Sequence, residues 1–136
     1  MIKLCYKTYS WKISNGACRT FKESTGKDLL GFFASYIVAS INLREGVSLF
    51  ERTETLRDVG SEDDASIALH CIISAAEDGI SLDEIKDATA RVSWTLSERA
   101  DDLSEPWPVE MLNTAFKINQ YLNDNLPKKK GDMSGE

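Results

Sequence analysis

The stretch Ala65-Ser-Ile-Ala-Leu-His-Cys-Ile-Ile-Ser-Ala-Ala-Glu77 decides the fold, because its apolar residues fall on nearly every side of a helical wheel. A helix that is apolar all round is buried on most of its faces. Ser61 and the three acidic residues after it predict the helix start, since a hydroxyl caps free backbone N–H groups and negative charge suits a helix N-terminus. Asp78-Gly79 predicts its end. We therefore expect a central buried helix over Ala65–Glu77, with the other segments packed around it.

The remaining segments predict more helices and a short N-terminal β element. Residues 2–8 alternate between apolar and polar side chains, which predicts one strand, and Tyr9–Ile13 is a candidate second strand. The predicted fold class is mainly α: a short N-terminal strand or hairpin, then five to six helices around the central one. The further helices are expected over Ala17–Ser24, from Asp28 to Ile41, over Ser48–Asp58, from Ser81 to near Trp94, and from Pro106 to Asn123–Asn125.

Length and composition predict a single domain over residues 1–126. The 136 residues suffice to bury a core, and 42% of them are hydrophobic. Residues 127–136 hold three lysines and little that is apolar, so we expect a disordered tail. No apolar run approaches the roughly 18 residues of a membrane span, no secretory signal is apparent, and three widely spaced cysteines match no metal or redox motif. These features predict a cytoplasmic protein that contacts no membrane.

Charge is divided unevenly along the chain, whose net charge is -6. Residues 1–44 carry seven Lys or Arg against two Asp or Glu, whereas residues 45–110 carry five against seventeen. Two explanations are open. Either these are solvated faces of one globule, or the basic start of one subunit meets the acidic middle of another. An acidic chain of this kind is not expected to bind nucleic acid.

No catalytic, cofactor or metal site is predicted. Ser24-Thr25-Gly26-Lys27 resembles the end of a phosphate-binding loop, but it lacks the first glycine and the magnesium-binding hydroxyl, so Gly26 is better explained as a helix stop. The only histidine, His70, lies in the most apolar helix and is interpreted as a hydrogen-bonded core residue. Four acidic residues lie close together near the end of the acidic middle: Glu98, Asp101, Asp102 and Glu105. They lack the ligand spacing of a calcium-binding loop and are interpreted as a solvated face. We therefore do not expect an enzyme.

The helix that follows Asp28 has apolar residues over a broad surface, which favours contact with another molecule. If Leu29, Phe33 and Ile37 face the core, Phe32 and Tyr36 lie on a neighbouring strip exposed in a monomer. We predict that this strip, together with Trp107, forms an oligomer or partner interface. Combined with the charge division, such a contact is expected to run head to tail, as a ring or a filament.

A family resemblance rests on residues 11–29. Trp11-Lys-Ile-Ser-Asn-Gly-Ala17, continuing through Phe21-Lys-Glu-Ser-Thr-Gly-Lys-Asp-Leu29, resembles the opening of small tail-morphogenesis proteins of phages and gene transfer agents, in particular the tail assembly chaperones of long-tailed phages. In that pattern a strand, a short helix ending in Thr-Gly-Lys and a longer helix follow one another. The resemblance implies a non-catalytic, oligomerising helical protein of the bacterial host cytoplasm. It would bind the tape measure protein and tail tube subunits during virion morphogenesis and be absent from the mature virion.

Two further points bear on this hypothesis. Such chaperones are commonly made in a short and a frameshifted long form, and Lys128-Lys129-Lys130 is a candidate frameshift region, or alternatively a solubilising basic tail. The competing hypothesis is a small acidic phage or bacterial protein that binds and inhibits a host enzyme or nucleic-acid complex, its acidic middle mimicking phosphate charge.

Overall fold

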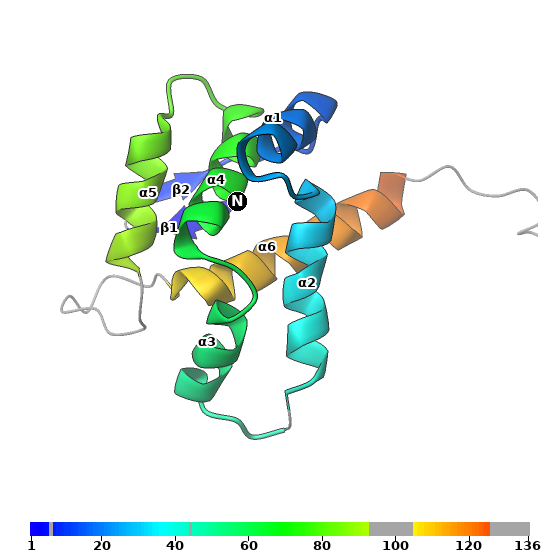
Figure 1. Ribbon diagram of the computed structural model, residues 1–136, viewed down its shortest axis with the longest axis vertical. Helices are drawn as coiled ribbons and strands as arrows, with labels where there is room; N and C mark the ends of the chain where they lie inside the picture. The colour runs from blue at the N-terminus through cyan, green and yellow to red at the C-terminus, as the bar shows by residue number, and fades with distance from the viewer. Residues whose placement is uncertain (6, 44, 93–104, 126–136) are drawn as a thin grey trace, which may run out of the picture.

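The computed structural model describes residues 1–5, 7–43, 45–92 and 105–125. The described residues form an antiparallel hairpin followed by six helices (Figure 1). The elements are β1 (Ile2–Leu4), β2 (Lys7–Tyr9), α1 (Asn15–Thr25), α2 (Leu29–Ile41), α3 (Leu49–Arg57), α4 (Glu62–Ser74), α5 (Leu82–Arg91) and α6 (Trp107–Asn125). The predicted fold class, mainly helical with an N-terminal hairpin, is confirmed. The predicted tail over 127–136 lies outside the described residues.

The alternating N-terminal segment folds back on itself instead of forming one strand. Ile2 pairs with Tyr9 and Leu4 with Lys7. Cys5, between the strands, has a φ of 56°, in the left-handed region that reverses a chain. The pairing places Ile2, Leu4 and Tyr9 in the core. The candidate second strand over Tyr9–Ile13 is absent, since β2 ends at Tyr9.

Local sequence signals explain where five of the helices begin. A side-chain oxygen in front of each accepts the backbone N–H three residues on, which satisfies one of the free donors of a first helical turn. These capping residues are Ser14, Asp28, Ser48, Ser61 and Ser81. Gly26, at a φ of 75°, ends α1 as the sequence predicts.

The central helix is present but shifted toward the N-terminus. It was expected over Ala65–Glu77, and α4 spans Glu62–Ser74. The acidic residues after Ser61 belong to its first turn, where they suit the helix dipole. At the other end, the amides of Ala76 and Glu77 both donate to Ile73 O, which closes the helix before Gly79.

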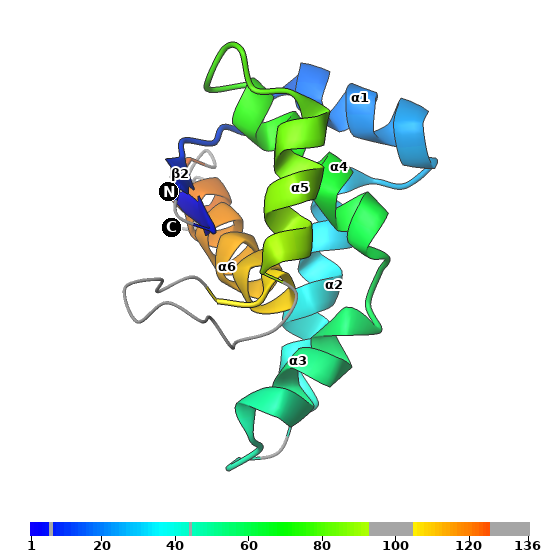
Figure 2. The same ribbon diagram turned by 90° about the vertical axis from the view of Figure 1, so that its left-hand side faces the viewer.

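Two helices organise the packing. The α4 helix lies between α1 and α5, and the longer α6 runs beneath them, where it contacts α2, α3 and β1 (Figures 1 and 2). Seven of the thirteen residues of α4 and nine of the nineteen of α6 are buried. The role of α6 as a second centre was not predicted from the sequence. The α2 helix crosses the C-terminal half of α6 at one side of the molecule (Figure 1).

Candidate partner-binding surface

The side of α2 that faces outward differs from the predicted one. Phe32 and Tyr36, expected on an exposed strip, are 7% and 0% exposed. With Leu29 and Phe33 they form the strip that faces the core, at the i, i+3, i+4 and i+7 spacing of one helix side. Ile37, expected inside, is only half-buried. The prediction that a monomer exposes Phe32 and Tyr36 is therefore wrong, and the strip proposed from the sequence is part of the core.

Aromatic contacts hold Phe32 in place. Its ring centroid lies 5.4 Å from that of Phe21 in α1 and 5.6 Å from that of Tyr36. Gly60, in the link between α3 and α4, lies so close that an added Cβ would be 2.6 Å from the Phe32 ring. The missing side chain at Gly60 therefore lets the backbone close over Phe32.

Trp107, the third predicted interface residue, is also buried, at 1% exposure. Its backbone N–H donates to Val92 O at 2.7 Å, which joins the start of α6 to the end of α5. The guanidinium carbon of Arg57 lies 5.7 Å from the centroid of its ring. The prediction of Trp107 as a surface contact is therefore wrong as well, because α3 and α5 meet α6 at this residue.

A different stripe of α2 is exposed. None of the thirteen residues of α2 is charged, although 28% of the chain is. Leu30, Ala34, Ile37 and Ile41 follow one another along one helix side. Leu30 and Ile37 are half-buried against the core, whereas Ala34 is exposed and Ile41 is 73% exposed. Val38, beside this stripe, is 60% exposed. The α2 helix thus exposes apolar residues, as expected, but these residues differ from the predicted Phe32 and Tyr36.

A narrow hollow lies between this stripe and α6. Its volume is about 60 Å³. The lining is apolar apart from one amide side chain, and comprises Leu30, Phe33, Ala34, Ile37, Ala115, Ile118, Asn119 and Leu122. We call this hollow, together with the exposed α2 stripe, the α2/α6 groove.

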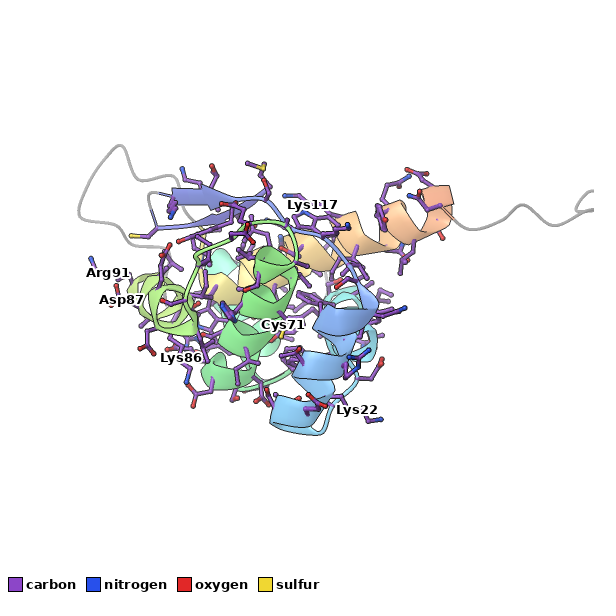
Figure 3. The ribbon with its side chains drawn as sticks, turned by 90° about the horizontal axis from the view of Figure 1, so that it is seen from above. Lys22, Cys71, Lys86, Asp87, Arg91 and Lys117 are labelled. Carbon is purple, nitrogen blue, oxygen red and sulfur yellow. The ribbon has the colours of Figure 1, made fainter. Side chains whose placement is uncertain are left out.

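The α6 edge of the groove is uncharged too. Ala115, Ile118, Asn119 and Leu122 line the groove from α6, and Phe116 follows Ala115 in the sequence. Phe116 is 48% exposed. The nearest charged residues of α6, Lys117 and Asp124, fall on other sides of the helix, and Lys117 Nζ donates to Met1 O at 2.6 Å (Figure 3). The groove is therefore an apolar surface without ionic groups of its own.

His70 makes structural hydrogen bonds, as the sequence predicts, but it is half-buried and does not belong to the core. Its Nε2 lies 2.8 Å from Ile80 O and 3.0 Å from Ser74 Oγ. A carbonyl oxygen only accepts, so Nε2 carries the proton and donates, which leaves it unable to take a proton from Ser74. Burial raises the pKa of the neighbouring Cys71 thiol to about 11, so this thiol stays protonated at neutral pH. His70 is therefore not placed to activate the Ser74 hydroxyl as a nucleophile, and the Cys71 thiol is not ionised to act as one.

The basic and acidic parts of the sequence meet within one chain. Lys7 Nζ lies 2.9 Å from Glu84 Oε2, and Lys27 Nζ lies 2.7 Å from Asp64 Oδ2. Asp87 pairs with Arg91 on the outer side of α5, away from α4 (Figure 3). Several carboxylates of the acidic middle are thus already paired, and these contacts need no second subunit.

Two smaller sequence interpretations can be compared with the structure. Gly26 is the left-handed residue after α1, and its N–H donates to Lys22 O at 2.7 Å, which supports its interpretation as a helix stop. No group of three or more His, Cys, Asp or Glu side chains suited to a metal ion occurs within the described ranges. Of the acidic group, Glu105 accepts from Asn113 Nδ2 at 3.0 Å, whereas Glu98, Asp101 and Asp102 lie outside the described residues, as do Lys128, Lys129 and Lys130.

None of the helices in the described part of the chain has the length and apolar character needed to cross a membrane. Comparisons of the chain with protein-family models, with curated proteins and with solved structures found no match.

Proposed function

We propose that the protein is a non-catalytic tail assembly chaperone of a long-tailed phage, which binds the tape measure protein and tail tube subunits in the bacterial host cytoplasm during tail morphogenesis. The observation that carries the proposal is the α2 helix, which has no charged residue and exposes an apolar stripe beside α6. An exposed apolar surface of this kind suits a protein that shields apolar segments of another chain.

The resemblance over residues 11–29 supports the same function. In the structure this segment contains α1, which ends at Thr25 before Gly26-Lys27, and the start of the longer α2. The short helix followed by a longer one agrees with the helical part of the pattern, whereas residues 11–29 contain no strand, because β2 ends at Tyr9. Self-association belongs to the proposal through the resemblance, and its contacts would involve side chains other than Phe32, Tyr36 and Trp107, which are buried within the chain.

Inhibition by phosphate mimicry has less support, because Asp64, Glu84 and Asp87 are already paired with cations of the same chain. The two functions differ in their response to salt. Binding through charge mimicry weakens steeply as ionic strength rises, whereas binding through apolar contacts does not.

Co-expression tests the proposed function. The tape measure protein from the same genome is produced in bacteria alone, with this protein, or with an unrelated acidic protein of similar size. We expect a larger soluble fraction of the tape measure protein only with this chain, and co-purification that persists at high salt. An insoluble tape measure protein in all three cultures would contradict the proposal. The nucleotides at codons 127–131 provide a separate check, since a slippery adenine run there supports a frameshifted long form.

A further inference from the structure

The N-terminal hairpin is attached to the helices through three carboxyl groups. It packs against α5 and α6, and the Lys3 backbone N–H lies 3.4 Å from Glu110 Oε2 in α6 (Figure 2). A second backbone N–H, that of Ser10, donates to Glu77 Oε2 in the link between α4 and α5. Glu84 of α5 accepts hydrogen bonds from two side chains of β2. Because a carboxyl group binds a proton in acid, an attachment of this kind depends on pH.

Glu110 is buried where β1 packs against α6, and it is only 6% exposed. The 3.4 Å contact from the Lys3 N–H is long for a hydrogen bond. Burial raises the pKa of Glu110, and the Glu105 carboxylate adds to this effect. The Lys3 N–H, the Lys117 ammonium and the Asn113 amide oppose it, but burial is the largest cause. The docked hairpin therefore favours a protonated Glu110.

The other helices that pack against α6 do not compensate the charge of Glu110. The α2 helix has no charged residue. In α3, the guanidinium carbon of Arg57 lies over the Trp107 ring, 5.7 Å from its centroid. No cation from the described residues of α2 or α3 contributes to the pKa of Glu110. An ionised Glu110 is thus balanced only by the groups of β1 and α6 named above.

Glu84 has the opposite preference. Its Oε2 accepts from Lys7 Nζ at 2.9 Å and from the Tyr9 hydroxyl at 2.8 Å. These bonds, that from Lys7 first, lower the pKa of Glu84. Asp87 and Arg91 line the same hollow between β2 and α5, but they pair with each other at 3.0 Å. The docked hairpin therefore favours an ionised Glu84.

The titratable groups on the α4 side of α5 have partners of their own. His70 Nε2 lies 2.8 Å from Ile80 O. The Glu77 carboxylate accepts the Ser10 N–H. Neither side chain bonds to Glu84, so the hairpin groups remain its main partners.

Glu84 and Glu110 change the docking of the hairpin in opposite directions as the pH changes. A raised pKa in the docked state gives a contribution that is complete below the undocked value and is lost as the pH rises through the docked value. A lowered pKa gives a contribution that is complete above the undocked value and is lost as the pH falls through the docked value. The two contributions are both large near the ordinary glutamate pKa of about 4.3.

We propose that docking of the N-terminal hairpin on α5 and α6 is a pH-sensitive switch, strongest in mild acid and weaker toward both neutral and strongly acidic pH. Release of the hairpin exposes Ile2, Leu4 and Tyr9, which are at most 2% exposed when it is docked. Neutral pH therefore uncovers apolar core surface more often than mild acid does. This response comes from the fold and does not depend on the proposed function.

Amide hydrogen exchange of the full chain, followed by NMR between about pH 3 and about pH 7.5, tests the switch. Exchange of the β1 and β2 amides reports release of the hairpin. Exchange of the Leu69 and Ile72 amides in α4 reports unfolding of the whole chain. After correction for the intrinsic exchange rate at each pH, we expect protection of the hairpin to be greatest in mild acid and to fall roughly threefold or more on each side. The α4 amides should stay better protected throughout.

Two variants separate the contributions. Glu110→Gln should keep the hairpin protected at neutral pH but retain the loss in strong acid. Glu84→Gln should weaken protection in mild acid and retain only the loss toward neutral pH. Glu23→Gln, at an exposed position of α1, is the matched control and should retain both losses.

A second measurement needs no variant. The side-chain carboxyl ¹³C shifts of the wild-type chain report protonation of each glutamate directly. We expect Glu110 to titrate at higher pH than Glu23, and Glu84 at lower pH.

Several results would overturn the proposal. These are hairpin protection that changes in one direction over the whole pH range, a Glu110→Gln chain that still loses hairpin protection at neutral pH, and titration of Glu110 and Glu84 together with Glu23. Equal changes in the protection of the hairpin and of α4 would also overturn it, because they would mean unfolding of the whole chain instead of release of the hairpin.

Discussion

The Tyr9 hydroxyl donates a hydrogen bond to Glu84 Oε2 at 2.8 Å, across 75 residues of sequence. The same carboxylate oxygen accepts from Lys7 Nζ at 2.9 Å. Ser81 and Glu84 have the spacing of a capping box, and the Ser81 hydroxyl indeed accepts the Glu84 N–H. The Glu84 side chain, however, bonds to the hairpin, so it connects β2 to α5.

Tyr9→Phe should lower the melting temperature by a few degrees at neutral pH, because it removes the donor but keeps the buried ring. The bonds from Lys7 and Tyr9 lower the pKa of Glu84. A lowered carboxyl pKa gives stability that is present above the unfolded-state value and lost as the pH falls through the folded-state value. The difference between Tyr9→Phe and wild type should therefore shrink in acid. Thr8→Val, on the exposed side of β2, is the control, and a difference that persists unchanged at low pH would contradict this role of Glu84.

Glu110→Gln should raise the free energy of unfolding at neutral pH. Glu110 is 6% exposed, and its Oε2 is 3.4 Å from the Lys3 backbone N–H. Burial raises the pKa of this carboxyl. A raised pKa means that the stabilising contribution is complete below the unfolded-state value and is lost as the pH rises through the folded-state value.

Urea unfolding of wild type and Glu110→Gln at acid and neutral pH measures this effect. The gain should be present at neutral pH and absent in acid, and Glu23→Gln, at an exposed position of α1, should show neither. A loss of stability in Glu110→Gln at neutral pH would mean that the charged carboxylate is favoured in the folded chain.

Phe32→Ser and Ile41→Ser should behave oppositely, although both remove an apolar side chain from α2. Phe32 is 7% exposed, and its loss should cost roughly 3–5 kcal/mol, as for other buried phenylalanines. Ile41 is 73% exposed, and its replacement should change stability by about 0.5 kcal/mol or less. Urea unfolding followed by circular dichroism distinguishes them. If the Phe32→Ser protein is folded and as stable as wild type, Phe32 is not a core residue.

Tyr36→Phe should leave the protein as stable as wild type or more stable. The Tyr36 side chain is fully buried, and its hydroxyl has no hydrogen-bond partner among the described residues. A buried hydroxyl without a partner costs about 1–3 kcal/mol, which the substitution relieves. Thermal unfolding measures the change, with Tyr121→Phe, at an exposed position, as the control. Clear destabilisation would reveal a partner for the hydroxyl, such as a buried water.

The sequence alone determined the helical fold class and most helix boundaries, because the responsible interactions are local. Ser14 and Ser81 bond to amides three residues on, and Gly26 adopts a backbone conformation that glycine favours. Such contacts depend little on the rest of the chain. His70 followed the same logic, since a lone polar ring in an apolar helix needs a nearby partner and finds one in Ile80 O.

Only the tertiary structure decided which side of α2 faces the core. A helix with no charged residue has no polar side that indicates which residues face solvent, so the sequence does not distinguish Phe32 from Ile37 as the buried residue. In the structure, α1 and Gly60 pack against Phe32. The α2/α6 groove likewise requires Ile118, 81 residues beyond Ile37, to be placed beside it. Pairings across such separations depend on how whole helices pack, and no local pattern in the sequence encodes them.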